Sequence, residues 1–158
     1  MKIRIGQGID FHRLETGKNL WLGGVSIPSK KGCVAYSDGD VLLHAICDAL
    51  LGAAGLPDIG FHFPDSDPEF RNIRSTVLLE RTFTIIRNKG WNVSNIDCSV
   101  CLEKPKIAPY IADMKEIISK ILYISTEDIS IKATTAEKLG FIGKSKGIVA
   151  IAAALLEK

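Results

Sequence analysis

Two segments of the chain carry the residues best suited to hold a metal ion. Asp10 and His12 lie two positions apart in an alternating, strand-like segment, so both side chains leave the same face of the strand. His44 lies near the start of a segment with helical periodicity. Two imidazoles and one carboxylate are a donor set of catalytic zinc sites, which keep one position open for substrate or water. Spacing alone leaves a second interpretation open, in which Asp10 and His12 are the solvated face of a strand.

More acidic residues follow His44. Asp48 lies four positions later, on the same face of a helix, where it either holds the second ring nitrogen of His44 or faces solvent. Residues 57–68 form a loop rich in Pro, Gly and Asp, whose carboxylates suit hydrogen bonds to hydroxyl groups or to a hydrated cation. The alternative is an acidic surface turn, since Asp favours turns. His62 in this loop is not expected to be a ligand.

Two other segments combine cationic side chains with the start of a helix. Residues 103–106 (Glu-Lys-Pro-Lys) end a predicted strand ahead of a helix, and free N–H groups at a helix start attract anions. Residues 132–144 hold adjacent threonines and several lysines, which predicts a phosphate cradle, although the spacing matches no P-loop. The alternative for this segment is a helix cap with a solvated basic rim.

Periodicity predicts the elements that position these residues. We expect three helices: one that begins at Asp38 or Asp40 and runs to residue 54, one at 75–89 and one at 109–122. A capping-box pattern at 134–137 predicts a further short helical turn. Strands are expected at 2–11, 20–22, 96–102 and 129–133. Residues 147–156 are predicted to be a strand that passes into a helical turn. The order predicts one α+β domain over residues 1–158, with a mixed four-stranded sheet and helices packed on one face. Small residues near the C-terminus favour oligomer packing, which would bury the other face.

Composition is ordinary for a soluble globular domain: 158 residues, 46% hydrophobic and 24% charged, with a net charge of +2. No charge run favours nucleic acid, and we expect no membrane segment or signal peptide and therefore a cytoplasmic, bacterial protein. A plastid protein trimmed of its transit peptide would look the same. Cys98 and Cys101 have C-x-x-C spacing, but in a strand they point to opposite faces, so the four cysteines are expected to be reduced and structural.

Five segments occur together in this chain: GIDFH, YSDGDVLLHAICDALLGAAGLPDIG, HFPDSDP, KPKIAPYI and IKATTAEKLGFIGK. By these the chain resembles the 2-C-methyl-D-erythritol 2,4-cyclodiphosphate synthase family over essentially its full length. The resemblance implies a homotrimer with the sheets facing the central axis and active sites between subunits. It implies cyclisation of 4-diphosphocytidyl-2-C-methyl-D-erythritol 2-phosphate with release of CMP, in the non-mevalonate isoprenoid pathway.

The resemblance also implies the site residues. Asp10, His12 and His44 would hold Zn²⁺, and Glu137 would hold a second divalent cation, Mg²⁺ or Mn²⁺, that bridges the substrate diphosphate. Thr135 and Tyr36 would be the catalytic residues that act on the diphosphate at the transition state. The methylerythritol, cytidine and phosphate parts of the substrate would contact Asp10, His12, Tyr36, Ser37, Asp58, Ile59, Gly60, Phe63, Pro64, Asp65, Ser66, Asp67, Leu102, Lys106, Ile107, Ala108, Ala133, Thr134, Thr135, Glu137, Phe141 and Lys144.

Four positions depart from the family's usual residues. Gln7 and Tyr36 replace histidines, and a phenol donates a hydrogen bond without carrying positive charge. Lys144 replaces an arginine and loses its bidentate geometry, and Ala136 replaces a frequent threonine. We predict an active enzyme. Two alternatives stay open: a non-haem iron oxygenase, which uses the same donor set, and an inactive binding module that retains the trimer and its cavity.

Overall fold

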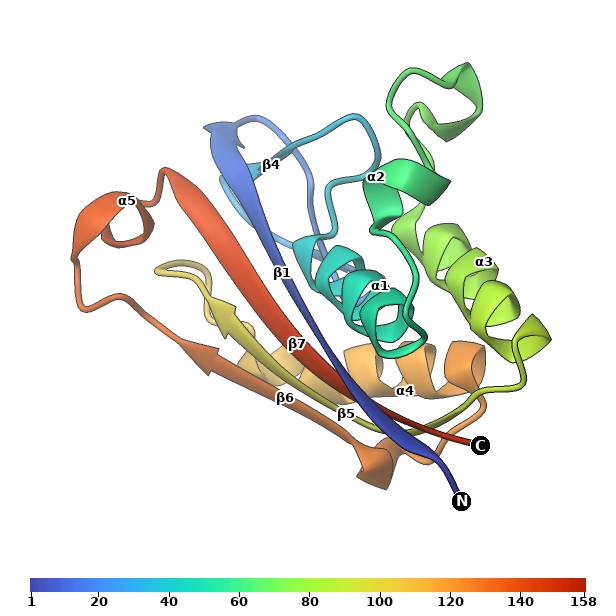
Figure 1. Ribbon diagram of the computed structural model, residues 1–158. Coiled ribbons are helices and arrows are strands. Elements are labelled where there is room, and N and C mark those ends of the chain that lie inside the picture. The colour runs from blue at the N-terminus through green and yellow to red at the C-terminus, as the bar shows by residue number, and fades with distance from the viewer.

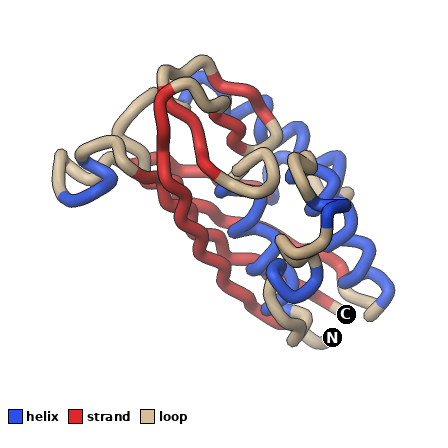
Figure 2. Tube along the Cα trace, turned by 90° about the horizontal axis from the view of Figure 1, so that it is seen from above, coloured by secondary structure: helices blue, strands red, loops and turns tan.

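A computed structural model describes residues 1–158 as two layers, a five-stranded sheet and a layer of helices on one of its faces (Figures 1 and 2). The elements, in chain order, are β1 (Ile3–Thr16), β2 (Leu20–Leu22), β3 (Val25–Ile27), β4 (Lys31–Val34), α1 (Val41–Ala53), α2 (Ile59–His62), η1 (Pro68–Phe70), α3 (Ser75–Asn88), β5 (Asn92–Cys101), η2 (Ala108–Tyr110), α4 (Ile111–Leu122), η3 (Thr126–Asp128), β6 (Ile129–Thr134), α5 (Gly140–Gly143) and β7 (Gly147–Glu157).

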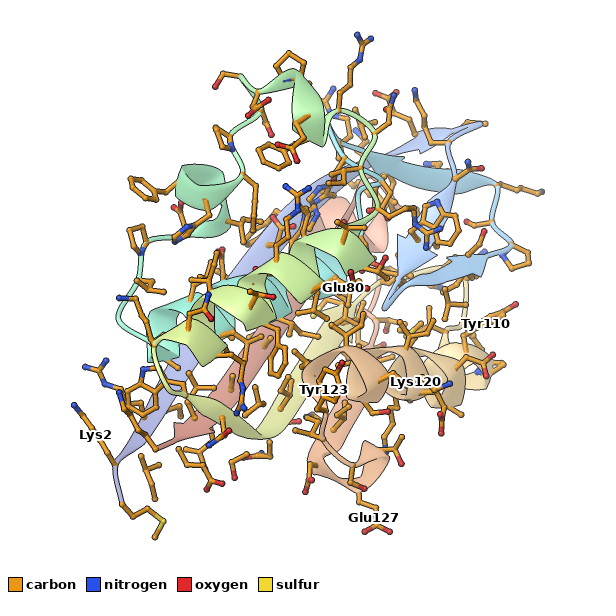
Figure 3. The ribbon with its side chains drawn as sticks, turned by 90° about the vertical axis from the view of Figure 1, so that its right-hand side faces the viewer. Lys2, Glu80, Tyr110, Lys120, Tyr123 and Glu127 are labelled. Carbon is orange, nitrogen blue, oxygen red and sulfur yellow. The ribbon has the colours of Figure 1, made fainter.

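The sheet is mixed, with the strand order β4-β1-β7-β5-β6. β1 pairs antiparallel with β4 and β7, β7 pairs antiparallel with β5, and β5 pairs parallel with β6. The parallel pair needs a crossover connection, which contains α4. β2 and β3 form a separate two-stranded sheet. Figure 3 looks onto the helix layer, where Glu80 of α3 and Lys120 of α4 are exposed. None of the helices is both long and apolar enough to cross a membrane.

The α+β class, the mixed sheet and the helices on one face are confirmed, but the predicted sheet was one strand short. The additional strand, β4, is only four residues long, which is too short to show alternation. The predicted helical turn at the C-terminus is wrong, because β7 continues to Glu157 between β1 and β5. The capping-box prediction at 134–137 is also wrong. Thr134 ends β6, and α5 begins only at Gly140, with no side-chain cap.

Two glycines let α1 lie directly against β1. A Cβ on Gly6 would come within 2.0 Å of the Ala49 carbonyl oxygen, and one on Gly8 within 2.0 Å of the Ala45 carbonyl oxygen. Any other residue at either position would therefore separate strand and helix. The other side of α1 packs on α3, so that helix is buried almost all round.

The sheet face away from the helices is uncovered within the chain, and its part on β1 and β7 is largely apolar, whereas Asp97 and Ser99 of β5 and Lys132 of β6 make the remainder polar. Ile3, Ile5, Ile9 and Phe11 of β1 lie on this face and are all at least half exposed. Cross-strand partners on β7 continue the surface with partly exposed Ile151 and apolar neighbours. We call this surface, formed by Ile3, Ile5, Ile9, Phe11, Ile151, Ala153 and Leu155, the open sheet face.

Candidate active site

Asp10, His12 and His44 form one cluster, as the sequence predicts. Asp10 and His12 leave β1 on the helix-facing side, and His44 lies in the first turn of α1, which the two glycines hold close to β1. Asp10 Oδ2 is 3.0 Å from His12 Nδ1 and 3.1 Å from His44 Nδ1. One ligand atom from each residue lies within 4.8 Å of the other two.

The donor atoms of this cluster fit a divalent cation. Nδ1 of His12 is buried and makes no hydrogen bond, although it lies 3.0 Å from Asp10 Oδ2. Donors around a tetrahedral Zn²⁺ lie about 3.3 Å apart, because each bond is about 2.0 Å long. The observed spacing is therefore close to that of donors that share one ion, and a cation would satisfy the unpaired nitrogen.

The charges at the cluster favour a cation. Burial raises the pKa of Asp10, but the adjacent His12 and His44 side chains outweigh it and lower the pKa to about 2. Burial lowers the pKa of His44, but the Asp10 hydrogen bond and the charges of Asp10, Asp40 and Asp38 outweigh it and raise the pKa. Asp10 is thus an anion at neutral pH. A bound metal ion would displace the proton that the Asp10 carboxylate otherwise holds on the His44 imidazole.

The second ring nitrogen of His44 has partners that sequence reasoning missed. Nε2 lies 2.8 Å from Ser75 Oγ and 3.2 Å from Ser37 Oγ. Asp48 neither holds this ring nor simply faces solvent, because its carboxylate accepts a hydrogen bond of 2.8 Å from the Ile59 backbone N–H and so anchors the start of α2. Ser75 carried no sequence signal beyond its place at the start of a predicted helix.

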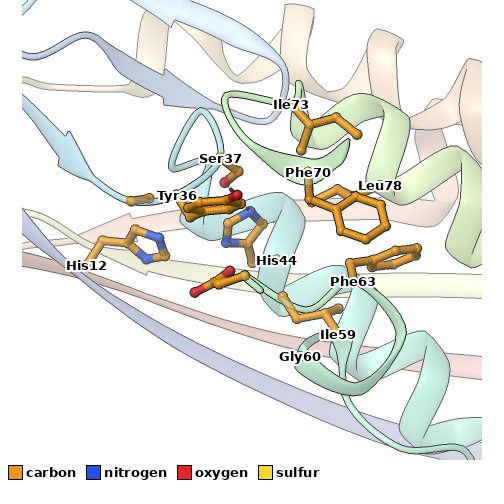
Figure 4. A pocket seen from close by; sticks show the side chains of 12 residues that line it. His12, Tyr36, Ser37, His44, Ile59, Gly60, Phe63, Phe70, Ile73 and Leu78 are labelled. Carbon is orange, nitrogen blue, oxygen red and sulfur yellow. Dashed lines mark hydrogen bonds between the residues drawn. The ribbon is translucent and has the colours of Figure 1, made fainter. Parts of the chain in front are cut away.

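A pocket of about 280 Å³ opens beside the cluster (Figure 4). His12 lies at one end, His44 and Tyr36 lie beside each other in the middle, and Phe63 and Phe70 lie at the other end. Of the residues predicted to bind substrate, it brings together His12, Tyr36, Ser37, Ile59, Gly60, Phe63 and Asp65.

Several predicted residues lie next to this pocket without lining it, namely Asp58, Pro64, Ser66 and Asp67. Asp58 and Asp67 use their carboxylates to cap short helices, accepting hydrogen bonds from the N–H groups of Phe61 and Glu69. The Tyr36 hydroxyl donates a hydrogen bond of 3.3 Å to the Asp67 carbonyl oxygen, which ties the segment after β4 to the loop after α2. Gln7 lies on the opposite face of β1 from Asp10 and His12, so its replacement of a histidine does not touch the cluster.

A second pocket, of about 210 Å³, lies where the parallel strands β5 and β6 end. It is lined by Leu102, Glu103, Pro105, Lys106, Ile107, Ala108, Ala133, Thr134 and Thr135. It shares no residue with the metal pocket. Three strand spacings, about 14 Å, separate β1 from β6. One chain therefore presents the two groups of predicted residues as two separate half-sites.

Glu137, Phe141 and Lys144 line neither pocket. All three are exposed, in the segment between β6 and β7, and the Phe141 ring packs 6.3 Å from Phe11 of the open sheet face. The cysteines form no disulfide, and Cys98 is buried while Cys101 is partly exposed, as expected for opposite faces of β5.

Comparison with known proteins places this chain in a family. A curated relative from Bacteroides thetaiotaomicron, named 2-C-methyl-D-erythritol 2,4-cyclodiphosphate synthase, is 52% identical over 158 residues, 100% of this chain and 99% of the relative. The solved bifunctional IspDF from Campylobacter jejuni has a TM-score of 0.94 at 41% identity; the match covers 98% of this chain but 42% of that longer one. The solved IspF–CDP complex from Plasmodium falciparum has a TM-score of 0.86 at 38% identity, over 98% of this chain and 95% of that one. The YgbB family model matches residues 3–157, and the chain belongs to the YgbB family.

Proposed function

We propose that this chain cyclises 4-diphosphocytidyl-2-C-methyl-D-erythritol 2-phosphate to 2-C-methyl-D-erythritol 2,4-cyclodiphosphate and releases CMP, as a step of the non-mevalonate route to isoprenoid precursors. The main support is the intact Asp10–His12–His44 cluster, which lies beside a pocket. Curated relatives that match the full length of the chain are named as this synthase. These names favour the cyclase over an iron oxygenase with the same donor set.

The chemistry asks the protein mainly for positioning. The attacking 2-phosphate oxygen and the β-phosphorus belong to one substrate molecule, so the site must fold that molecule until the CMP leaving group lies in line with the attack. A zinc ion held by Asp10, His12 and His44 would act as a Lewis acid on the phosphate oxygens. In the proposal the metal pocket holds the methylerythritol, through Asp58, Ile59, Gly60 and residues 63–67.

The second pocket suits the other half of the substrate. Its walls are apolar on the side of Leu102, Ile107 and Ala108, which suits a pyrimidine ring, and Lys106 supplies a positive charge beside the Thr134 and Thr135 hydroxyls. We assign the cytidine to this pocket, and the solved relative with bound CDP supports a nucleotide ligand for the family. Thr135 would donate to the diphosphate, Glu137 would hold the second cation, Mg²⁺ or Mn²⁺, and Phe141 and Lys144 would close the phosphate end.

Two features support an active site shared between copies. The half-sites do not meet within one chain, and the open sheet face is an apolar surface of the kind that monomeric proteins seldom expose. We propose a homotrimer in which the three open sheet faces pack around the central axis. The metal pocket of one subunit then lies next to the nucleotide pocket of its neighbour.

Incubation of the purified chain with substrate and Mg²⁺, followed by chromatography, tests the activity. We expect CMP and the cyclic diphosphate in equal amounts, and no CMP from a His44→Ala control that retains its fold. Absence of CMP from the zinc-loaded parent would refute the activity and favour an inactive binding module. Metal analysis of protein purified without added metal should find zinc; tightly bound iron would favour the oxygenase.

A mixing experiment tests the shared site. His44→Ala and Thr135→Ala each remove one half-site, so each variant alone is expected to be inactive. The two variants are unfolded together in equal amounts and reassembled at random. Each interface in a closed ring takes one half-site from each of two subunits, and each half-site is intact half of the time, so about a quarter of the interfaces have both halves intact. Recovery of about a quarter of the parent activity supports the arrangement, and no recovery would place both halves in one chain.

A further inference from the structure

We infer that Ser75, held by Asp38, is a positioning residue that fixes which ring nitrogen of His44 faces the metal site. The inference rests on the metal site proposed above. Ser75 is the first residue of α3 and is fully buried. Its Oγ contacts His44 Nε2 at 2.8 Å on one side and the Asp38 carboxylate on the other. Asp38, Ser75 and His44 thus form a continuous row of hydrogen-bonding groups that ends at Asp10.

The direction of each hydrogen bond in this row follows from the Asp38 carboxylate. An ionised carboxylate only accepts, and Asp38 accepts from the backbone N–H groups of Asp40 at 3.1 Å and Ser75 at 2.9 Å, and from Arg74 Nε at 3.2 Å. A hydroxyl has a single proton, so the Ser75 hydroxyl donates it to Asp38. Ser75 is left with lone pairs toward His44.

The consequence for His44 is a fixed tautomer. Because Ser75 Oγ can only accept on that side, Nε2 of His44 carries a proton and donates it. In the neutral ring Nδ1 then has the free lone pair, and it points at Asp10 Oδ2, 3.1 Å away, where the cation would lie. With Nε2 deprotonated instead, its lone pair would face the Ser75 oxygen.

Ser37 does not replace Ser75 in this role. Its Oγ lies farther from Nε2, at 3.2 Å, and also accepts a hydrogen bond from the Gly39 N–H. Ser37 lines the metal pocket and is partly exposed, whereas Ser75 is fully buried. Arg74, beside Ser75, stacks 3.6 Å over Trp21 and donates to the Gly24 carbonyl oxygen, which secures the start of α3.

The test compares two hydroxyl deletions on α3. Zinc dissociation constants are measured by competition with a chromophoric chelator for the parent, for Ser75→Ala, and for Thr82→Val. Thr82 is also fully buried on α3, two turns further along, and serves as the matched control. Loss of an outer partner of a ligating histidine weakens metal binding about 10- to 100-fold, which is the expectation for Ser75→Ala. Thr82→Val should leave zinc affinity within threefold of the parent.

A second measurement needs no variant to fold. ¹⁵N–¹H correlation spectra of the zinc-loaded parent, labelled at histidine, should show a protonated Nε2 and a metal-bound Nδ1 for His44. A metal-bound Nε2, or unchanged zinc affinity in a folded Ser75→Ala, would overturn the inference while the metal site stands. A parent that binds no zinc would overturn the metal site itself. If Ser75→Ala does not fold, the spectra decide.

Discussion

Substitution of Gly8 by alanine should damage both the fold and the metal site. A Cβ at Gly8 would lie 2.0 Å from the Ala45 carbonyl oxygen and 2.8 Å from the Ala49 backbone nitrogen. An ordinary carbon–oxygen contact is about 3.3 Å, so strand and helix must separate by more than about 1 Å. Both obstructing atoms are backbone, so no side-chain rotation relieves the contact.

The magnitude follows from where the clash occurs. Overpacking a core costs about 1–3 kcal/mol, and an obstruction made of backbone belongs at the upper end, about 3 kcal/mol. Ala45 follows His44 directly, so the same shift moves the imidazole away from Asp10 and His12. Metal sites require donor distances within about 0.2 Å, so we expect zinc affinity to fall at least tenfold as well.

Urea unfolding of the metal-free proteins and chelator competition measure the two effects, at one fixed protein concentration because an oligomer's stability depends on it. Gly52→Ala is the matched control on α1: the nearest atom to its Cβ would be the Gln7 carbonyl oxygen at 3.9 Å. Helix propensity then predicts a gain of up to about 1 kcal/mol. The reasoning is refuted if Gly8→Ala stays within about 0.5 kcal/mol of the parent, or if Gly52→Ala loses as much.

Three further outcomes follow from individual contacts. In metal-free protein the lowered pKa of Asp10, about 2 against 3.8, stabilises the fold above pH 3.8 and is lost as the pH falls toward 2. Acid titrations of stability should therefore show about 2 kcal/mol less loss in Asp10→Asn, and equal curves would contradict this. Tyr36→Phe removes one neutral hydrogen bond to the Asp67 carbonyl oxygen, worth about 1 kcal/mol. Steady-state kinetics should therefore show KM raised about fivefold, with kcat and zinc content little changed. A large fall in kcat alone would instead assign Tyr36 to the transition state. Burial raises the pKa of the Cys33, Cys47 and Cys98 thiols to about 12. A thiol reagent at pH 8 should therefore leave these three unmodified in native protein and modify them only on unfolding. More than one modified thiol per native chain would contradict their burial.

Sequence periodicity predicted the long elements well, because each repeats a pattern over several turns or several strand residues. α3 begins at Ser75 as expected, and α1 is capped by Asp40, whose carboxylate accepts from the Leu43 N–H. β4 escaped prediction because four residues carry no period. The helical turn predicted at the end of β7 is wrong because residues 147–156 are apolar throughout and show no clear period, and only pairing on both sides keeps the segment extended.

The site was predictable only in part. Strand geometry paired Asp10 with His12, and His44 at a predicted helix start offered a third ligand, but only the family motifs favoured this metal site over a solvated strand, since nothing local shows that β1 and α1 touch. The relevant signal is Gly6 and Gly8, whose missing side chains allow that contact. Ser75 and Asp38 contact each other across 37 positions of sequence, and such a contact depends on tertiary packing that one sequence does not display.

The two half-sites differ in how firmly the chain holds them. Asp10 and His12 pair with Ala150 and Ile148 of β7, and His44 lies on a helix buried between the sheet and α3, so the metal half is preformed. The nucleotide half ends in a loop where Glu137 and Lys138 both adopt left-handed backbone angles, with φ of 49° and 64°. Such angles cost about 1 kcal/mol or more per residue and persist only where the surroundings fix them. Within the chain, Gly143 packs so closely on this loop that a Cβ there would come within 2.1 Å of the Lys138 backbone, but Glu137 itself is exposed. A neighbouring subunit that brings its metal pocket to this loop would supply the missing contacts, so in the proposed trimer the same interface that joins the half-sites also orders the less rigid one.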